Sequence, residues 1–103
     1  MNADSFQQLD KVIHEKNRMA IMSLLAASKE MSFTDIRESL KMTDGNLITH
    51  IRRLQKAEYV AVSKSYKEKR PLTTCRLTAE GSDAFRGYVD LLEGIVQLAR
   101  KTN

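Results

Sequence analysis

The feature that most restricts the fold of this chain is a pair of short amphipathic segments with only residues 41–43 between them. In the first segment, Ser32 followed by Asp35 three residues later forms a capping-box pattern, in which the serine oxygen accepts a backbone hydrogen bond at a helix start. Its apolar positions recur at helical spacing: Phe33, Ile36 and Leu40. The second segment opens at Thr43, a preferred N-cap residue type. Because a turn of about three to four residues between two short helices is typical of a helix-turn-helix, the sequence predicts this motif over residues 32–58.

The second helix of this pair has one apolar face and one face of small and cationic residues. With about 100° between successive residues of a helix, Leu47, Ile51 and Leu54 fall together, and we predict that they face the core. The opposite side carries Gly45, Thr49, Arg52, Arg53 and Lys56, with Asn46, Ile48 and His50 at its flanks. Small groups and adjacent arginines on an outward face indicate a helix that lies close against a partner.

Beyond Tyr59 the hydrophobic pattern changes from a helical period to strict alternation. The alternation in YVAVSKSY, and again in LTTCRLT, predicts the two strands of a hairpin that forms a wing over residues 59–77, with Cys75 pointing inward. The connecting stretch SKSYKEKRP is strongly basic. Because proline cannot donate to a strand ladder, we expect Pro71 to keep that part of the hairpin from forming a regular ladder.

Helices are also predicted on both sides of this unit. An apolar stripe over residues 5–14 indicates a short helix docked on a partner, and EKNRMAIMSLLAASKE indicates a more buried helix of about 12 residues. A helix over residues 79–100, capped by Thr78, would be about 33 Å long. A domain of this size cannot cover that length, so we expect the surplus apolar stripe to meet the same stripe of a second copy. The predicted dimer interface consists of Phe6, Leu9, Ile13, Phe85, Tyr88, Leu91, Leu92, Ile95 and Leu98.

The positive charge of the chain is concentrated in one third of its length. The chain has 103 residues, which favours a single domain over residues 1–103, and a formal net charge of +4. Residues 43–76 hold eight lysines and arginines against three acidic residues, an excess of five positive charges. Residues 1–42 are neutral in sum, and residues 77–103 carry one net negative charge. A concentrated positive field is the expected footprint of a polyanion-binding surface.

Several classes of protein are disfavoured by what the sequence lacks. It has no glycine-rich phosphate loop, no Ser, His and Asp arrangement and no metal-spaced cluster, so we predict neither an enzyme nor a bound cofactor or metal. No apolar run approaches the about 18 residues needed to span a bilayer, and the first residues lack the features of a secretion signal. With Cys75 as the single cysteine, no disulfide framework is expected. A cytoplasmic protein that does not bind membranes is the simplest expectation.

The order of predicted elements is helix, helix, helix-turn-helix, two-stranded ribbon and long helix, which is that of a winged helix-turn-helix. The runs TDGNL, LQKAEYV and RLTAEG are the most specific, and over residues 9–96 the chain resembles the small winged-helix transcriptional regulators of the MarR and ArsR groups. This resemblance implies sequence-specific binding of double-stranded DNA by a homodimer, usually to repress transcription. One departure is AEYV, where such sequences often have AGYV, so that Glu58 must close the helix at a position that favours glycine.

A major groove about 12 Å wide admits one α-helix, so the second helix of the pair is the predicted reading element. Asn46 suits adenine, and Arg52 or Arg53 suits the O6 and N7 atoms of guanine. Asp44 either favours the helix dipole or accepts from cytosine, and His50 is more readily a partly buried histidine than a base contact. The predicted DNA-binding residues are Thr43, Asp44, Gly45, Asn46, Thr49, His50, Arg52, Arg53, Lys56, Lys64, Lys67, Lys69 and Arg70, of which the last four would contact phosphates or the minor groove from the wing.

Other functions fit the same elements. A winged helix can serve as a protein–protein interaction module, for which the face over residues 45–56 lacks an aromatic anchor. Binding of single-stranded nucleic acid would need aromatic residues on the basic surface, where only Tyr66 qualifies. The chain has no added sensing domain, and a small-molecule effector is left open. The apolar residues around which one could bind are Phe6, Met19, Phe85 and Tyr88.

Overall fold

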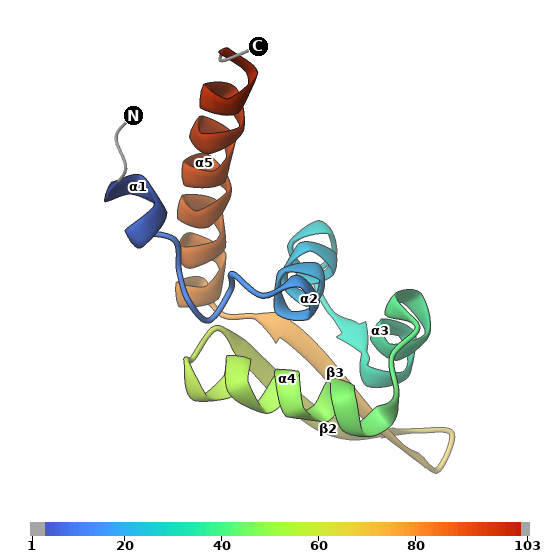
Figure 1. Ribbon diagram of the computed structural model, residues 1–103. Coiled ribbons are helices and arrows are strands. Elements are labelled where there is room, and N and C mark those ends of the chain that lie inside the picture. Colours follow the sequence, from blue (N-terminus) through green and yellow to red (C-terminus); the bar gives the residue numbers. More distant parts are fainter. Residues whose placement is uncertain (1–3, 102–103) are drawn as a thin grey trace.

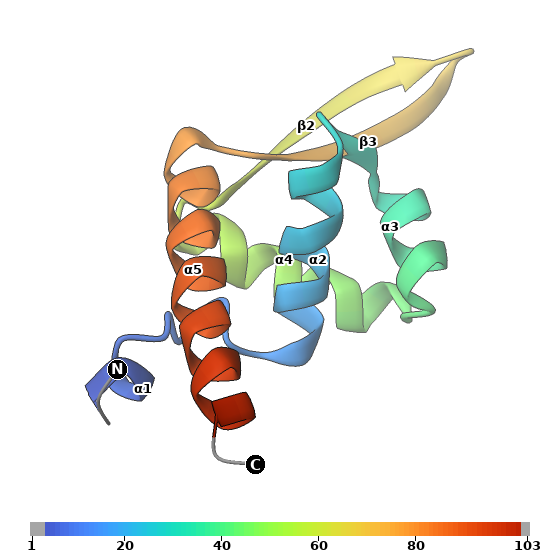
Figure 2. The ribbon, with the colours of Figure 1, turned by 90° about the horizontal axis from the view of Figure 1, so that it is seen from above.

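The computed structural model describes residues 4–101, which form five helices and three strands. The elements are α1 (Asp4–Gln7), α2 (Lys16–Ala27), β1 (Met31–Ser32), α3 (Phe33–Leu40), α4 (Asp44–Lys56), β2 (Val60–Lys67), β3 (Arg70–Leu77) and α5 (Ala79–Lys101). The sheet is antiparallel with the strand order β1-β3-β2. Helices α2, α3 and α4 pack together beside it, while the β2–β3 hairpin and α5 extend from this body in different directions (Figure 1 and Figure 2). The arrangement is the predicted winged helix with a long C-terminal helix, and its principal extents are 56 × 25 × 21 Å.

Helices α3 and α4 form the predicted helix-turn-helix, and their apolar faces contribute to one core. Leu47, Ile51 and Leu54 of α4 are at most 3% exposed, which confirms the face predicted from helical spacing. The core also includes Ile36 of α3 and Ile13 from the turns before α2, and it extends to α2, the sheet and α5 through Ile21, Met22, Leu25, Val60, Cys75 and Tyr88. Because α4 buries this face, its opposite face is directed outward.

Both helices of the motif begin at the predicted caps. Ser32 Oγ accepts a hydrogen bond from the N–H of Asp35 at 3.0 Å, and Thr43 Oγ1 accepts one from the N–H of Asn46 at 3.1 Å. Each bond satisfies a backbone amide that has no partner within its own helix. The start of α4, which carries much of the candidate site, is therefore well defined.

The ends of α3 and α4 adopt the same backbone motif, and neither uses glycine. Lys41 has φ 55° after α3 and Glu58 has φ 65° after α4, both in the left-handed region. At the end of α4, the N–H of Tyr59 donates to Leu54 O at 3.0 Å, and the N–H of Glu58 donates to Gln55 O at 2.9 Å. These are the two hydrogen bonds of a Schellman motif. Glu58 therefore closes the helix as the sequence AEYV requires.

The wing is a more regular hairpin than the sequence indicated. The ladder between β2 and β3 is continuous up to the Lys67–Arg70 pair, and it includes the Tyr66–Pro71 pair. The expectation that Pro71 interrupts the ladder is wrong. The pair that flanks a two-residue turn is hydrogen-bonded, so the adjacent Tyr66–Pro71 pair is of the non-hydrogen-bonded type. The missing N–H of the proline therefore removes no ladder bond.

The structure also contains a third strand that the sequence did not indicate. β1 is two residues long, with Met31 opposite Cys75 and Ser32 opposite Thr74 of β3. Two residues are too few to show alternation, so only the partner strand had a recognisable pattern.

The predicted helix over residues 5–14 is wrong beyond its first turn. Helix α1 ends at Gln7, and the chain then passes through turns before α2 starts. Asp10 Oδ1 accepts from the N–H of Val12 at 2.8 Å and from the N–H of Ile13 at 3.1 Å. An aspartate that bonds to nearby backbone amides stabilises a turn in competition with a helix, and apolar spacing alone does not reveal this.

Helix α5 begins at its predicted cap. Thr78 Oγ1 accepts from the N–H of Gly81 at 2.9 Å and donates to Glu58 O at 2.6 Å. A Cβ atom placed on Gly81 would lie 2.0 Å from Tyr59 O, so this glycine allows α5 to pass close to the chain that follows α4. The later turns of α5 extend away from the body (Figure 1). No helix within residues 4–101 is long and apolar enough to cross a membrane.

Candidate nucleic-acid interface

The outer face of α4 is open along its whole length. Eight of the residues predicted to bind DNA lie at or along α4 and are exposed: Thr43, Asp44, Gly45, Asn46, Thr49, Arg52, Arg53 and Lys56. Nothing lies within 4 Å of a Cβ atom built on Gly45, so no other part of the protein limits approach to the start of the helix. Thr49 Oγ1 donates to Gly45 O at 2.9 Å, which leaves its oxygen as an acceptor and its methyl group for apolar contact.

The wing carries the other cations predicted to contact DNA. Lys64, Lys67, Lys69 and Arg70 are all exposed on the β2–β3 hairpin. The hairpin closes with a two-residue turn in which Glu68 has φ 54° and Lys69 has φ 67°. Positive φ at both turn positions gives the turn whose twist matches that of the strands. The wing therefore presents its cations on a regular ribbon.

Seven cations of α4 and the wing form one set, which we call the cationic surface: Arg52, Arg53, Lys56, Lys64, Lys67, Lys69 and Arg70. Within residues 4–101, the basic side chains that lie within ion-pair distance of a carboxylate are other residues, namely Arg18, Arg37, Arg86 and, only when it is protonated, His50. All seven side chains of the cationic surface are therefore available to an anionic partner.

Asp44 makes a contact that the sequence did not predict. Its Oδ1 accepts from Arg37 Nη1 at 2.6 Å, an ion pair that links the start of α4 to α3. The hydrogen bond to Asp44 raises the pKa of Arg37. The Asp44 side chain is 72% exposed, but its carboxylate is paired, so it repels a nearby phosphate less than a free carboxylate would.

His50 does not lie on the outer face of α4, which corrects its inclusion among the DNA-binding residues. Its side chain is 13% exposed and contacts the start of α2. Nδ1 lies 3.2 Å from Arg18 Nη1, and Nε2 lies 3.4 Å from Asn17 Nδ2. Helical spacing placed this residue at the flank of the apolar face, where contacts with another element decide between burial and exposure. The alternative of a partly buried histidine is confirmed.

A groove with a volume of about 320 Å³ lies between α4 and the wing. Its lining is apolar at Phe33, Ile48, Ile51, Val62 and Cys75 and polar or cationic at Arg52, Gln55, Lys64 and Thr73. Gln55 and Thr73 were not singled out from the sequence, because only the fold brings them together. Burial raises the pKa of the Cys75 thiol to about 11, so the thiol is protonated and weakly reactive at neutral pH.

The residues predicted for a dimer interface divide into two groups. Ile13 and Tyr88 are at most 3% exposed within one protomer, so they belong to its core, and their prediction as interface residues is wrong. Tyr88 Oη donates to Met19 Sδ at 3.2 Å, and burial raises the pKa of Tyr88. The others are partly or well exposed: Phe6, Leu9, Phe85, Leu91, Leu92, Ile95 and Leu98. Helix α5 also exposes Val89 and Val96, at 41% and 43%, which were not among the predicted residues.

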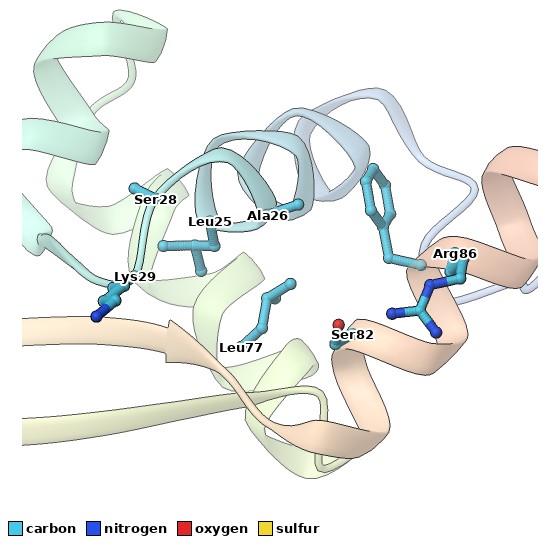
Figure 3. A pocket seen from close by; sticks show the side chains of 8 residues that line it. Leu25, Ala26, Ser28, Lys29, Leu77, Ser82 and Arg86 are labelled. Atoms are coloured by element: carbon cyan, nitrogen blue, oxygen red, sulfur yellow. The ribbon is translucent and has the colours of Figure 1, made fainter.

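A separate cavity of about 410 Å³ lies between the end of α2, the end of β3 and the start of α5 (Figure 3). Its lining consists of Leu25, Ala26, Ser28, Lys29, Leu77, Ser82, Phe85 and Arg86. Of the four residues around which the sequence left an effector open, only Phe85 lines this cavity, whereas Met19 and Tyr88 contact each other. Within residues 4–101, no three His, Cys, Asp or Glu side chains gather as they would around a metal ion.

The fold and this surface define a winged-helix protein of the transcriptional-regulator type, and comparisons with known proteins agree. The family model described as a winged helix DNA-binding domain matches residues 17–96. An uncharacterized protein of Methanocaldococcus jannaschii is 32% identical over 79 residues, which cover 77% of this chain and 86% of that protein. The chain therefore belongs to the winged helix DNA-binding domain family.

Two solved structures show the same fold. A transcriptional regulator homologue from Pyrococcus horikoshii OT3 has a TM-score of 0.85 at 25% sequence identity, and the match covers 91% of this chain and 95% of that one. A protein from Enterococcus faecalis V583 assigned to the MarR family of transcriptional regulators has a TM-score of 0.80 at 19% identity, over 99% of this chain and 93% of that one. In fold, the chain is therefore similar to a transcriptional regulator homologue and to a protein assigned to the MarR family. The resemblance to the ArsR group stays a prediction.

Proposed function

We propose that this protein is a cytoplasmic, homodimeric transcriptional regulator that binds double-stranded DNA sequence-specifically and acts as a repressor. In this proposal, α4 lies in the major groove, and the wing lies along the phosphate backbone or in the adjacent minor groove. Membership of the winged-helix family supports the general class. The charge and shape of the surface support the mode of binding.

The observation that carries the proposal is the cationic surface. Its seven side chains come from α4 and the wing, which face each other across one groove, and none of them forms an ion pair within residues 4–101. Protein surfaces that bind no polyanion usually intersperse both signs of charge. Duplex DNA carries one negative charge per about 1.7 Å of helix axis, so several of these cations can contact phosphates at once.

The outer face of α4 has the shape that a DNA groove requires. Gly45 has no side chain and Thr49 has a short one, so the start of the helix can approach base edges closely. Asn46 presents a donor and an acceptor suited to adenine, and Arg52 and Arg53 present paired donors suited to guanine. The free backbone amides of the first turn suit a phosphate.

Helix α5 supports the homodimer. Val89, Val96 and Leu98 are between 37% and 43% exposed on a helix whose later turns stand clear of the body (Figure 1). Apolar side chains in such a position are commonly covered by a second copy of the same chain. In a dimer, the two α4 helices would bind half-sites about 34 Å apart, one turn of the duplex.

The proposal is tested by measuring the binding of labelled genomic duplex fragments at a series of salt concentrations. Affinity should fall steeply with salt, with a slope of log K against log salt of about −0.9 for each phosphate contacted. Arg53→Ala should weaken binding and relax base preference, whereas Lys67→Ala should weaken all sequences alike and reduce the slope by about one. Lys29→Ala, at the cavity beside α5, is the control. Unchanged affinity and slope in both test variants would reject the assignment.

The alternative is a winged-helix module that binds another protein and not DNA. The outer face of α4 carries no aromatic anchor, although Tyr66 on the wing is 78% exposed. A lack of duplex binding at low salt would favour this alternative. Repression needs a separate measurement with a reporter gene whose promoter overlaps the bound site, where the protein is expected to lower transcription.

A further inference from the structure

His50 joins α4 to the start of α2 through a cluster of polar side chains. Its Nδ1 lies 3.2 Å from Arg18 Nη1, and its Nε2 lies 3.4 Å from the side-chain amide of Asn17. Glu15 Oε1 is 3.7 Å from the same Nδ1 and 4.0 Å from Arg18 Nη1. The side chains of His50, Arg18 and Glu15 are 13%, 17% and 30% exposed, so solvent reaches the cluster only in part.

The donor chemistry of arginine determines the protonation state of His50 in this contact. A guanidinium has N–H donors and no acceptor, so the bond from Arg18 requires an unprotonated Nδ1 that offers its lone pair. The ring proton then resides on Nε2, where Asn17 accepts it if the amide oxygen is turned toward the ring. The contact with Arg18 therefore exists only for the neutral imidazole.

Arg18 is itself held by several neighbours. Its Nε donates to Val12 O at 2.5 Å, and its backbone N–H donates to Glu15 Oε1 at 2.8 Å, where Glu15 caps α2. Burial acts to raise the pKa of Glu15, but the N–H groups of Arg18 and Asn17 and the positive charge of Arg18 act to lower it, and it is lowered overall, so the carboxylate is ionised at neutral pH. Because these bonds hold the Arg18 side chain in place, its contact with His50 can fix the position of α4 relative to the start of α2.

We propose that the Arg18–His50 contact positions α4 for DNA and that protonation of His50 releases it. A protonated Nδ1 becomes a donor, so it loses the bond from Arg18 and turns toward the Glu15 oxygen that lies 3.7 Å away. The two positive side chains, His50 and Arg18, then repel each other. Within residues 4–101, β2, which also packs against α4, forms no hydrogen bond or ion pair with the ring. On α4 itself the charged residue one turn further on is Arg53, which offers no acceptor.

The sign of the pH effect distinguishes this role from simple electrostatics. An added positive charge on a DNA-binding helix strengthens its attraction to phosphates, so affinity would rise on acidification. Release of α4 from Arg18 predicts a fall in affinity on acidification instead. His50 is thus a positioning residue, and the inference rests on the DNA binding proposed above.

The test compares the duplex affinity of the wild type, His50→Gln and His14→Gln at about pH 8 and about pH 5.5. Glutamine can accept from Arg18 but takes up no proton in this range. His14 is the other histidine of the chain, and its Nδ1 lies 2.9 Å from Tyr88 Oη. His14→Gln serves as the control. On acidification, the wild type and His14→Gln should lose about tenfold more affinity than His50→Gln. Equal losses in all three proteins, or tighter binding by the wild type at the lower pH, overturn the inference.

A second measurement without DNA separates this inference from the proposed function. Backbone amide NMR signals of α2 and α4 should shift together with the titration of the His50 ring in the wild type and remain in place in His50→Gln. If no duplex binds at either pH, the proposed function fails, and the amide titration alone decides the inference. Amide signals of α4 that do not respond to protonation of His50 overturn it.

Discussion

Arg37 Nη1 and Asp44 Oδ1 lie 2.6 Å apart, and this ion pair joins α3 to α4 across the turn of the helix-turn-helix. Asp44 is the single acidic residue of α4, so Arg37 neutralises the one carboxylate on a helix whose outer face is otherwise uncharged or cationic. The positive end of the helix dipole then remains open to a phosphate. A cation inside the motif thus makes an acidic residue compatible with an anion-binding surface.

Neutralising Asp44 should strengthen duplex binding. Asp44→Asn removes a negative charge beside the proposed phosphate path and should raise affinity by about two- to fivefold at low salt, an effect that shrinks as salt screens it. Arg37→Gln leaves the Asp44 carboxylate unpaired and should lower affinity. Fluorescence anisotropy at two salt concentrations measures both changes. Weaker binding of Asp44→Asn to sites with one particular cytosine would show instead that Asp44 contacts that base.

Gly45→Ala should change stability and DNA binding in opposite directions. Nothing lies within 4 Å of the added Cβ, and alanine favours a helix over glycine by about 0.5–1 kcal/mol, so urea unfolding should show equal or higher stability. The methyl group would occupy space between α4 and the groove floor. Overpacking costs about 1–3 kcal/mol, which corresponds to a loss of about 5- to 150-fold in affinity. Unchanged affinity in a duplex titration would show that this end of α4 does not approach DNA closely.

Local periodicity explains what could be predicted about the fold. The core face of α4 was predictable because Leu47, Ile51 and Leu54 repeat at helical spacing, and their burial follows from that spacing alone. The residue at which α1 ends was not predictable, because Asp10 stabilises a turn through hydrogen bonds that the apolar pattern does not show. Ile13, which looked like part of a surface stripe, therefore enters the core from a turn.

Some features of the candidate site could likewise be predicted from the sequence, and others could not. The cationic surface could be predicted, because the charges are dense in sequence and the helical angle separates them from the core. The partner of His50 could not be predicted, since Arg18 is 32 residues earlier in the chain. Gln55 and Thr73 share a groove only after the wing has folded beside α4, so neither sequence spacing nor charge could associate them.

Gly81→Ala should destabilise the protein, whereas Gly87→Ala on the same helix should not. A Cβ atom on Gly81 would lie 2.0 Å from Tyr59 O, which is backbone and cannot rotate away, so α5 must shift at a cost of about 2–3 kcal/mol. Nothing lies within 4 Å of a Cβ atom on Gly87, and helix propensity predicts a gain of about 0.5–1 kcal/mol. Urea unfolding at one protein concentration compares them. Wild-type stability of Gly81→Ala would mean that α5 does not pass Tyr59 so closely.

Tyr59 links the end of α4 to the turn that precedes α2, and its ionisation has a defined effect on stability. Its Oη donates to Asp10 Oδ2 at 2.5 Å. This hydrogen bond, together with partial burial and the negative charges of Asp10 and Glu80, raises the pKa of Tyr59 to about 12. The ordinary pKa of tyrosine is about 10. Because the folded-state pKa lies above the unfolded one, the stabilisation is fully present below about pH 10 and is lost as the pH rises through about 12.

Tyr59→Phe should therefore be less stable than the wild type at neutral pH and approach it under alkaline conditions. Loss of a hydrogen bond to a carboxylate predicts a deficit of about 1.5–3 kcal/mol at pH 8. Urea unfolding should show this deficit shrinking above about pH 10, because Tyr59 of the unfolded wild type then loses its proton while folded Tyr59 keeps it up to about pH 12, which favours the unfolded state. Tyr66→Phe, at a side chain that is 78% exposed on the wing, should match the wild type throughout. A deficit of Tyr59→Phe that stays constant up to about pH 12 would mean that the bond to Asp10 does not retain the phenol proton, and the polar link between α4 and this turn would then be weaker than its geometry implies.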